Sequence, residues 1–271
     1  MASEQGPLIY RQKRSTRATH WLWAICLFFL MFSGLQIFNA HSTLHFGKES
    51  GFDYNNAGLD IQARQVGDEV KGYTTILGRD FETTGYLGFS GGQYRAFPAA
   101  LTIPSGHSLA TGRVIHLFFA WVLVATLTVW LIFSLFNGHL VTLIPTITDI
   151  KRLPRDIANH IRLRFHHSGD YNVLQKLAYA GVLFIALPVM VATGLTMSPG
   201  FNAAAPWLLD LFGGRQTARS IHFIVMVALI LFFFVHMLMI LAAGPINELR
   251  SIVTGWYRVD PDKGGKDDRA A

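Results

Sequence analysis

The sequence predicts an all-α integral membrane protein in which four transmembrane helices form a bundle. Of its 271 residues, 51% are hydrophobic and 15% are charged, a balance typical of a chain that lies largely in a membrane. Four stretches contain no Asp, Glu, Lys or Arg and are long enough to cross about 30 Å of hydrocarbon. These stretches are 18–38, 114–138, 177–198 and 220–243.

The first helix is expected at about 17–38, directly after a basic tail. A secretory signal has a shorter apolar region and ends at a small-residue cleavage site, and no Ala-x-Ala site follows here. We therefore expect an uncleaved helix. The other helices are expected at about 112–137, 173–198 and 218–243, within a single membrane domain that covers 1–271.

The distribution of Lys and Arg predicts the orientation of the four helices. Basic residues gather in the N-terminal tail, in the connection of about 139–172, and after the fourth helix. These three segments fall on one side of a four-span topology, which the positive-inside rule makes cytoplasmic. Both termini are then cytoplasmic, in a bacterial inner membrane. The net charge of +6 thus reflects topology and gives no indication of nucleic-acid binding.

A long loop between the first two helices, at about 39–111, is expected on the periplasmic side. It is rich in Gly, Asn, Thr and Tyr, and its short aromatic and β-branched runs between turn glycines are compatible with a small hairpin. A loop of this length is usually functional or a docking surface. On the cytoplasmic side, "TDIKRLPRDIANHIRLRF" favours a short amphipathic interfacial helix.

Four of the eleven histidines lie in predicted spans, at His20, His116, His222 and His236. An imidazole in hydrocarbon is costly unless something engages it. Residues 222 and 236 are fourteen positions apart, so they project from one helix face about 21 Å apart along the axis.

Depth pairs these histidines across helices. The predicted topology puts His116 and His222 near the outer surface (the outer pair), and His20 and His236 near the cytoplasmic surface (the inner pair). Two pairs of neutral imidazoles in a four-helix bundle are what two bis-histidine b-type haems require, each iron taking one nitrogen from each of two helices. The alternative is that each imidazole only hydrogen-bonds a neighbouring Ser or carbonyl.

Other ligands and metals fit these residues less well. A catalytic zinc site needs three ligands that converge on one point, whereas the four histidines converge on two. His41 and His45 have i, i+4 spacing but lie in the loop without a third ligand, so we assign them to the surface. The single cysteine, Cys26, excludes a disulfide and covalent attachment of haem through C-x-x-C-H.

Further residues are candidates for contacts with haem. Gly34 follows His20 by fourteen residues, so it would leave room for the edge of the outer macrocycle, or be a small residue at a helix contact. Arg17, Arg113 and Arg219 lie near the pairs and could bind haem propionates, because Arg binds carboxylates in a bidentate manner. Each could equally be an interface anchor.

Four stretches of the sequence resemble those of a known protein family. The stretches are "RSTRATHWLWAICLFFLMFSGL", "GRVIHLFFAW", "YNVLQKLAY" and "GGRQTARSIHFIVMVALILFFFVH", which touch all four spans. They are similar to the four-helix dihaem cytochrome b subunits of bacterial formate dehydrogenases, nickel-iron hydrogenases and thiosulfate reductases, related to bacterial cytochrome b561.

This resemblance implies an electron-transfer subunit with two haem b groups, not a catalyst on its own. It would carry electrons between a quinone (ubiquinone or menaquinone) and a periplasmic oxidoreductase. It also implies a quinone pocket beside the inner pair, with Asn172 and Gln175 as candidate residues, although both could be a helix cap and polar anchor. The long loop is closest to thiosulfate-reductase-like cytochromes that accompany periplasmic molybdenum enzymes of the sulfite-oxidase type.

Two rival functions remain open. Small four-helix dihaem cytochromes of similar build oxidise superoxide outside and pass the electron to quinone, and an anionic substrate favours a basic surface. Here the loop has five Lys or Arg against seven Asp or Glu, which favours docking of a partner. A haem-free transporter or sensor would use the same histidines for protons or metal, and an absorption spectrum distinguishes it.

Overall fold

The computed structural model describes residues 6–50, 55–136, 138, 140, 143–161 and 173–259. The chain divides into two compact units. We call them the terminal unit, Met1–Trp21 with Val129–Ile185 and Leu229–Ala271, and the loop unit, Leu22–Thr128 with Ala186–Ala228.

Four helices are long and apolar enough to cross a membrane, as the sequence predicts. The boundary between the two units falls within each of them. The first, second and fourth each begin three residues earlier than expected, and the first and fourth begin at arginines, whose stems can cover apolar surface while their heads reach water. The helices are α1 (Arg14–Phe38), α2 (Leu109–Phe136), the third span (Val173–Thr196) and α9 (Arg215–Ala243).

The third span changes its helical pitch near the middle. It consists of α5 (Val173–Gly181), the π-helical segment η2 (Val182–Ala186) and α6 (Leu187–Thr196). Pro188 follows the π-helical turn, at the start of α6. A proline has no N–H and its ring clashes with the carbonyl four residues earlier, so the widened turn accommodates it.

The terminal unit also contains two shorter helices and a pair of strands. Helix α4 (Ile147–Ile161) has one apolar face, as the interfacial interpretation predicts, and α10 (Pro245–Thr254) follows α9 after Gly244, whose φ of 108° interrupts the helix. Strands β1 (Leu8–Tyr10) and β8 (Trp256–Arg258) pair antiparallel, with Ile9 opposite Tyr257. The two ends of the described chain are therefore joined by backbone hydrogen bonds.

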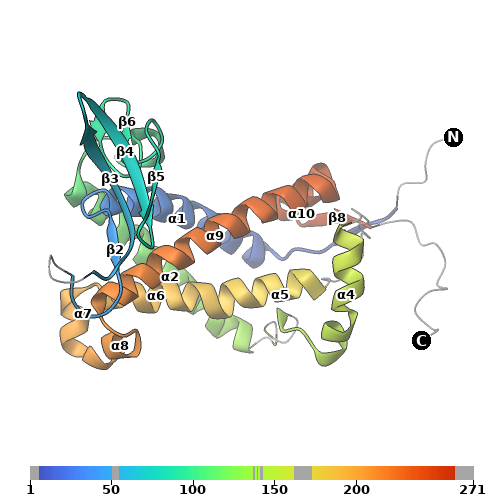
Figure 1. Ribbon diagram of the computed structural model, residues 1–271. Coiled ribbons are helices and arrows are strands. Elements are labelled where there is room, and N and C mark those ends of the chain that lie inside the picture. The colour runs from blue at the N-terminus through green and yellow to red at the C-terminus, as the bar shows by residue number, and fades with distance from the viewer. Residues whose placement is uncertain are drawn as a thin grey trace. The chain divides into compact units, whose positions relative to one another are not determined.

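The loop unit carries a β-sheet, so the expectation of an all-α chain is wrong for residues 39–111. The sheet has four antiparallel strands in the order β2-β3-β4-β5, and β3, β4 and β5 lie side by side in Figure 1. Apolar and polar side chains alternate in 57–76, and tight two-residue turns join the strands, which together explain why this segment forms a sheet. The strands are β2 (Thr43–His45), β3 (Ala57–Val66), β4 (Glu69–Ile76) and β5 (Arg79–Glu82).

The turns of this sheet have the backbone that tight hairpins require. Val66 pairs with Glu69 across Gly67 and Asp68, and Ile76 pairs with Arg79 across Leu77 and Gly78. Gly67, Leu77 and Gly78 have positive φ angles of 62°, 49° and 80°, which match the right-handed twist of the paired strands. The sequence is compatible with a small hairpin in 72–89, which corresponds to β4 and β5, and the structure adds β3 and β2 on the β4 side of this hairpin.

Apolar residues connect this sheet to the ends of two long helices. Phe38 at the end of α1, Leu44, Ile61 and Ala96 form a buried cluster, and Phe223 of α9 packs against it. The remaining elements of the loop unit are short: β6 (Phe89–Ser90), β7 (Gln93–Tyr94), η1 (Ala99–Leu101), α7 (Pro199–Ala204) and α8 (Pro206–Leu211).

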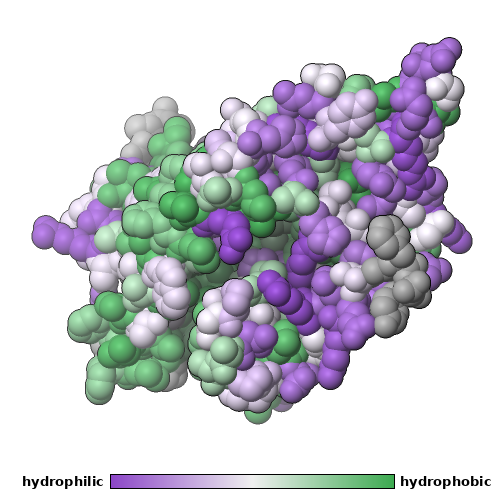
Figure 2. Space-filling model, turned by 90° about the vertical axis from the view of Figure 1, so that its left-hand side faces the viewer, coloured by the Kyte–Doolittle hydropathy of each residue, from purple (hydrophilic) through white to green (hydrophobic). Residues whose placement is uncertain are grey.

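Exposed apolar side chains cover the long helices. Val114, Phe118 and Trp121 of α2 are all more than half exposed, which is the pattern of a helix that faces lipid. In Figure 2, hydrophobic and hydrophilic residues gather in separate areas of one face. Together with the four helices, this surface identifies a multi-pass membrane protein.

Candidate functional site

The outer pair lies in the loop unit. His116 from α2 and His222 from α9 face each other with ring centroids 6.4 Å apart and ring planes inclined by 58°. Helix α2 is held against α1 by an aromatic stack, since the rings of Phe29 and Phe119 lie 4.3 Å apart and are nearly parallel. The packing of α1 on α2 thus fixes the turn from which His116 projects.

The inner pair lies in the terminal unit and has nearly the same geometry. His20 from α1 and His236 from α9 have ring centroids 6.5 Å apart and planes inclined by 49°. Phe232, one turn before His236, stacks on its ring at 5.8 Å, and Trp21 lies edge-on to His20 at 5.5 Å. Residues predicted to share a depth therefore lie together, and their role as ligands stays a prediction.

The spacing of each pair fits one metal ion held between two imidazoles. A ring nitrogen lies on the order of 1 Å from the ring centroid and about 2 Å from the metal that it binds. Two such rings on opposite sides of one iron have centroids about 6 to 6.5 Å apart. Both observed separations agree with this arrangement, whereas rings in direct contact would be closer.

A serine on α1 fixes the protonation of one outer ring. The Ser33 Oγ lies 3.1 Å from Nδ1 of His116 and is fully buried. Its hydroxyl proton is donated to the Phe29 carbonyl, 2.5 Å away. A hydroxyl has a single proton, so Ser33 accepts the hydrogen bond from Nδ1–H of His116. The lone pair of Nε2 is then available to a metal.

A threonine on α6 does the same for the other outer ring. Thr193 Oγ1 lies 2.9 Å from Nδ1 of His222, is fully buried, and donates its proton to the Val189 carbonyl at 2.7 Å. His222 therefore donates through Nδ1–H and keeps its Nε2 lone pair. Neither hydroxyl was among the predicted site residues.

Each of these hydroxyl residues precedes a glycine that touches the same ring. A Cβ on Gly34 would lie 3.3 Å from Cε1 of His116, and a Cβ on Gly194 would lie 3.5 Å from Cε1 of His222. The tripeptides Ser33-Gly34-Leu35 and Thr193-Gly194-Leu195 are thus two copies of one local pattern. This repeat was a signal in the sequence that could have revealed both hydroxyls. Room for a macrocycle at Gly34 stays a prediction.

The inner pair lacks such partners in the part of the chain that the structure describes. His20 Nδ1 is buried and has no hydrogen-bond partner there. A buried imidazole nitrogen without a partner costs free energy, and this unpartnered ring nitrogen fits a site that holds a further group. The outer and inner pairs therefore share their ring spacing but differ in what holds the rings.

Comparison with known proteins assigns the chain to a family. Residues 11–255 match the family described as prokaryotic cytochrome b561. The chain belongs to this family. It is accordingly a cytochrome b561-type electron-transfer subunit of a membrane, and membership of the family implies haem b. The resemblance predicted from the sequence is confirmed.

A curated relative of this cytochrome is a protein of Azospira oryzae that carries the name "Putative protein-methionine-sulfoxide reductase subunit YedZ1". It is 29% identical over 127 residues, which are 46% of this chain and 62% of that protein. The cytochrome thus spans about three fifths of the length of the relative that it matches.

The three predicted arginines have different surroundings in the cytochrome. Arg17 donates to the Val253 carbonyl at 2.5 Å, and Arg113 is exposed. Arg219 donates to the carbonyls of Thr43, at 2.8 Å, and His41. These hydrogen bonds of Arg17 and Arg219 are with backbone carbonyls, and binding of propionates by these residues stays a prediction.

Asn172 lies outside the described residues of the cytochrome, while Gln175 is half-buried in the first turns of α5.

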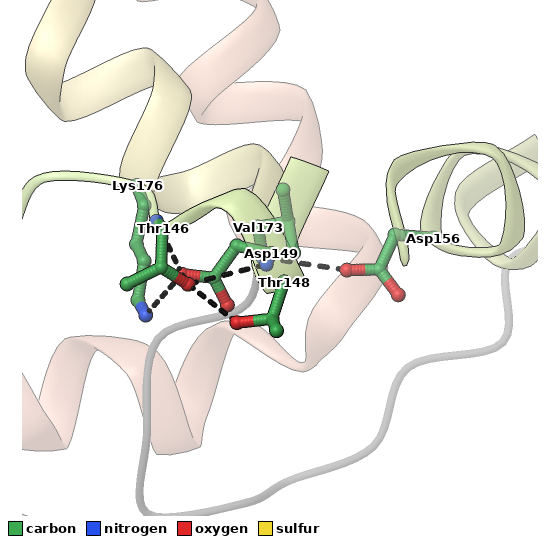
Figure 3. Close-up of polar contacts among 6 residues, drawn as sticks. All are labelled: Thr146, Thr148, Asp149, Asp156, Val173 and Lys176. Atoms are coloured by element: carbon green, nitrogen blue, oxygen red, sulfur yellow. Dashed lines mark hydrogen bonds and ion pairs between the residues drawn. The ribbon is translucent and has the colours of Figure 1, made fainter. Parts of the chain in front are cut away.

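The residues next to Gln175 bind two carboxylates. The Lys176 ammonium lies 2.9 Å from an Asp149 carboxylate oxygen, and Asp156 accepts from the Val173 N–H at 3.3 Å (Figure 3). Two carboxylates of α4 thus attach this helix to the start of the third span.

Asp149 also caps its own helix. It accepts from the backbone N–H of Thr146 at 2.9 Å, and the Thr146 hydroxyl accepts from the Asp149 N–H at 3.2 Å. The hydrogen bond from the Thr146 N–H, with those from Lys176 and from the Thr146 hydroxyl to the same carboxylate, lowers the pKa of Asp149 to about 2. The reciprocal contacts form a capping box.

The His41 and His45 rings lie 5.8 Å apart at β2. Burial and the charge of Arg219 lower the pKa of His41, so this ring is neutral at pH 7. Among the described residues, no group of three or more His, Cys, Asp or Glu could hold a metal ion. Nothing in this geometry adds a third ligand to the two histidines.

Proposed function

We propose that this cytochrome binds two haem b groups and carries electrons between a periplasmic oxidoreductase and the quinone pool of the bacterial inner membrane. The observation that carries the proposal is the pair of facing imidazoles repeated in each unit at 6.4 and 6.5 Å. Membership of the cytochrome b561 family supports it, because that family implies haem b.

In this proposal, His116 with His222 would bind the iron of one haem, and His20 with His236 would bind the iron of the other. Haem, when bound, supplies reversible one-electron chemistry. The protein holds the rings, keeps them neutral, and excludes water from the nitrogens that face the metal. Arg113 and Arg219 on one side and Arg17 on the other would neutralise propionates.

The quinone would bind beside the inner pair. Gln175 and Asn172 are the proposed contacts, because a side-chain amide can donate a hydrogen bond to a quinone carbonyl and accept one from a quinol hydroxyl. The contacts of Asp149 and Asp156 with the start of α5 support this placement, since they hold the helical turn that carries Gln175.

The partner would dock on the loop unit, at the sheet formed by 43–82. A folded, hydrogen-bonded sheet in a connection between two membrane helices presents a defined surface. A relative named as a reductase subunit supports a partner oxidoreductase. We propose a periplasmic molybdenum enzyme as this partner, in keeping with the length of the loop.

Quinone coupling can be tested on the purified protein. Haem reduced with dithionite and freed of reductant without oxygen should be reoxidised when a short-chain ubiquinone or menaquinone analogue is added. Gln175→Leu should slow this reoxidation while leaving the absorption spectrum unchanged, and Gln216→Leu, which lies in the loop unit, should leave the rate unchanged. Haem that stays reduced with both quinones would contradict the proposal.

A further inference from the structure

We infer that Ser33 and Thr193 are positioning residues of the outer pair, and that their hydroxyls make the outer haem harder to reduce than its two ligands alone would. This inference rests on the proposed function, because it concerns the haem held by His116 and His222. The hydroxyls themselves do not contact the metal.

The first step concerns the direction of the hydrogen bonds. Each hydroxyl has one proton, and the nearest carbonyl four residues earlier takes it, at 2.5 Å for Ser33 and 2.7 Å for Thr193. If either imidazole accepted at Nδ1 instead, the hydroxyl would have to withdraw its proton from that carbonyl. Two oxygen lone pairs would then face each other inside an apolar helix contact, which is unfavourable.

The second step concerns what this does to the ligand. When an imidazole donates a hydrogen bond from Nδ1–H to an acceptor, its Nε2 becomes a more basic ligand and the plane of its ring is fixed. A more basic ligand stabilises the ferric ion more than the ferrous ion. Because Ser33 acts on one axial ligand and Thr193 on the other, their effects should add.

The third step is the difference between the two pairs. In the described part of the chain, His20 Nδ1 has no partner, whereas both outer rings are anchored by residues that are fully buried. The glycines beside the hydroxyls allow α1 and α6 to approach these rings. The anchors therefore belong to the outer pair, where an electron would enter from the partner.

The inference is tested with Ser33→Ala, Thr193→Val and the double variant in the purified holoprotein. Redox titration and electron paramagnetic resonance should follow the two haems separately, and a His222→Ala variant identifies the outer signal. Each single variant should raise the outer midpoint potential and change only the outer ferric signal. Loss of an outer-shell partner typically changes metal affinity 10- to 100-fold, and a tenfold loss confined to the ferric form equals 59 mV.

Matched variants separate positioning from packing. Ser33→Thr and Thr193→Ser keep the hydroxyl and should restore the wild-type potential. Thr196→Val removes a buried hydroxyl from the same helix, one that donates to the Thr193 carbonyl at 2.7 Å, and should leave both potentials unchanged. If the alanine and valine variants lose the outer haem while the hydroxyl-retaining variants keep it, the inference is also supported.

Two results would overturn the inference in different ways. If the protein holds two haems and neither Ser33→Ala nor Thr193→Val moves the outer potential or signal, the inference fails and the proposed function stands. If the wild-type protein takes up no haem in haem-replete cells, the proposed function fails, and the inference fails with it.

Discussion

Gly34 of α1 lies against the imidazole of His116 of α2, so closely that a Cβ at position 34 would be 3.3 Å from ring atom Cε1. Gly34→Leu should therefore displace the ring and remove the outer haem, because a branched side chain cannot fit a contact that is already tight. Gly34→Ala should keep the haem but change its ferric spectrum. Haem content and absorption spectra measure both effects.

Gly181 gives the matched control for this prediction. It also lies in a membrane span, but a Cβ there would meet no atom within 4 Å. Gly181→Leu should retain both haems and the wild-type spectrum. Equal loss of haem in the Gly34→Leu and Gly181→Leu variants would show that the effect comes from helix destabilisation and not from the contact with His116.

We expect the ionised Asp149 carboxylate to make the stability of the fold sensitive to acid. Its pKa in the folded protein is about 2, below the ordinary value of 3.8. A carboxyl group with a depressed pKa stabilises the fold fully above pH 4 and loses this contribution as the pH falls towards 2. Thermal melting in detergent should thus decline more steeply between pH 5 and pH 2 in the wild type than in Asp149→Asn.

The Asp149→Asn variant should also be less stable than the wild type at pH 7, where the wild-type carboxylate is ionised. Asp68→Asn, in the turn between β3 and β4, is the control and should keep the wild-type pH profile. If Asp149→Asn and the wild type show parallel profiles, the ionised Asp149 carboxylate does not stabilise the fold through its pair with Lys176.

We expect Arg95 to stabilise the loop unit. The Arg95 residue is 3% exposed. Its guanidinium donates five hydrogen bonds to neutral oxygens, including one of 2.7 Å to the Ser105 carbonyl and one of 3.1 Å to Gln36 of α1. Replacement by Ala removes all five donors, although the Phe97 carbonyl keeps its hydrogen bond from Asn39, and should cost on the order of 3 kcal/mol.

Thermal melting and limited proteolysis of residues 88–108 measure this cost. Arg95→Lys should recover only part of the stability, since an ammonium cannot reach five acceptors arranged around a planar group. Arg79→Ala, at an exposed position in β5, should leave the melting temperature and the cleavage rate unchanged. An Arg95→Ala protein as stable as Arg79→Ala would refute the prediction.

The helices and the histidine pairs could be predicted because their signals are regular. A helix that crosses a membrane needs about 20 apolar residues, and charge at its ends indicates its direction. Once the four directions were assigned, the sequence positions of His20 and His236, and of His116 and His222, gave their depths. The facing rings seen in the two units agree with that argument.

The side-chain contacts that the sequence does not predict depend on the tertiary fold. A serine or threonine in a membrane helix usually bonds to the carbonyl four residues earlier, so neither Ser33 nor Thr193 alone indicates a contact with a histidine, and only the repeated hydroxyl-Gly-Leu pattern links the two positions. The hydrogen bonds of Arg219 to the carbonyls of Thr43 in β2 and of His41 depend on the fold of the loop, which brings these residues near α9, and binding of a propionate by Arg219 stays a prediction.

The most direct test is the haem content of the purified protein and of its histidine variants. The wild type should give a b-type pyridine haemochrome with about two haems per chain, and His222→Ala and His236→Ala should each retain one haem, with different potentials. His107→Ala, outside the four spans, should retain both haems. A well-folded, colourless wild type from haem-replete cells, or a His222→Ala His236→Ala double variant that still holds two haems, would contradict the proposal.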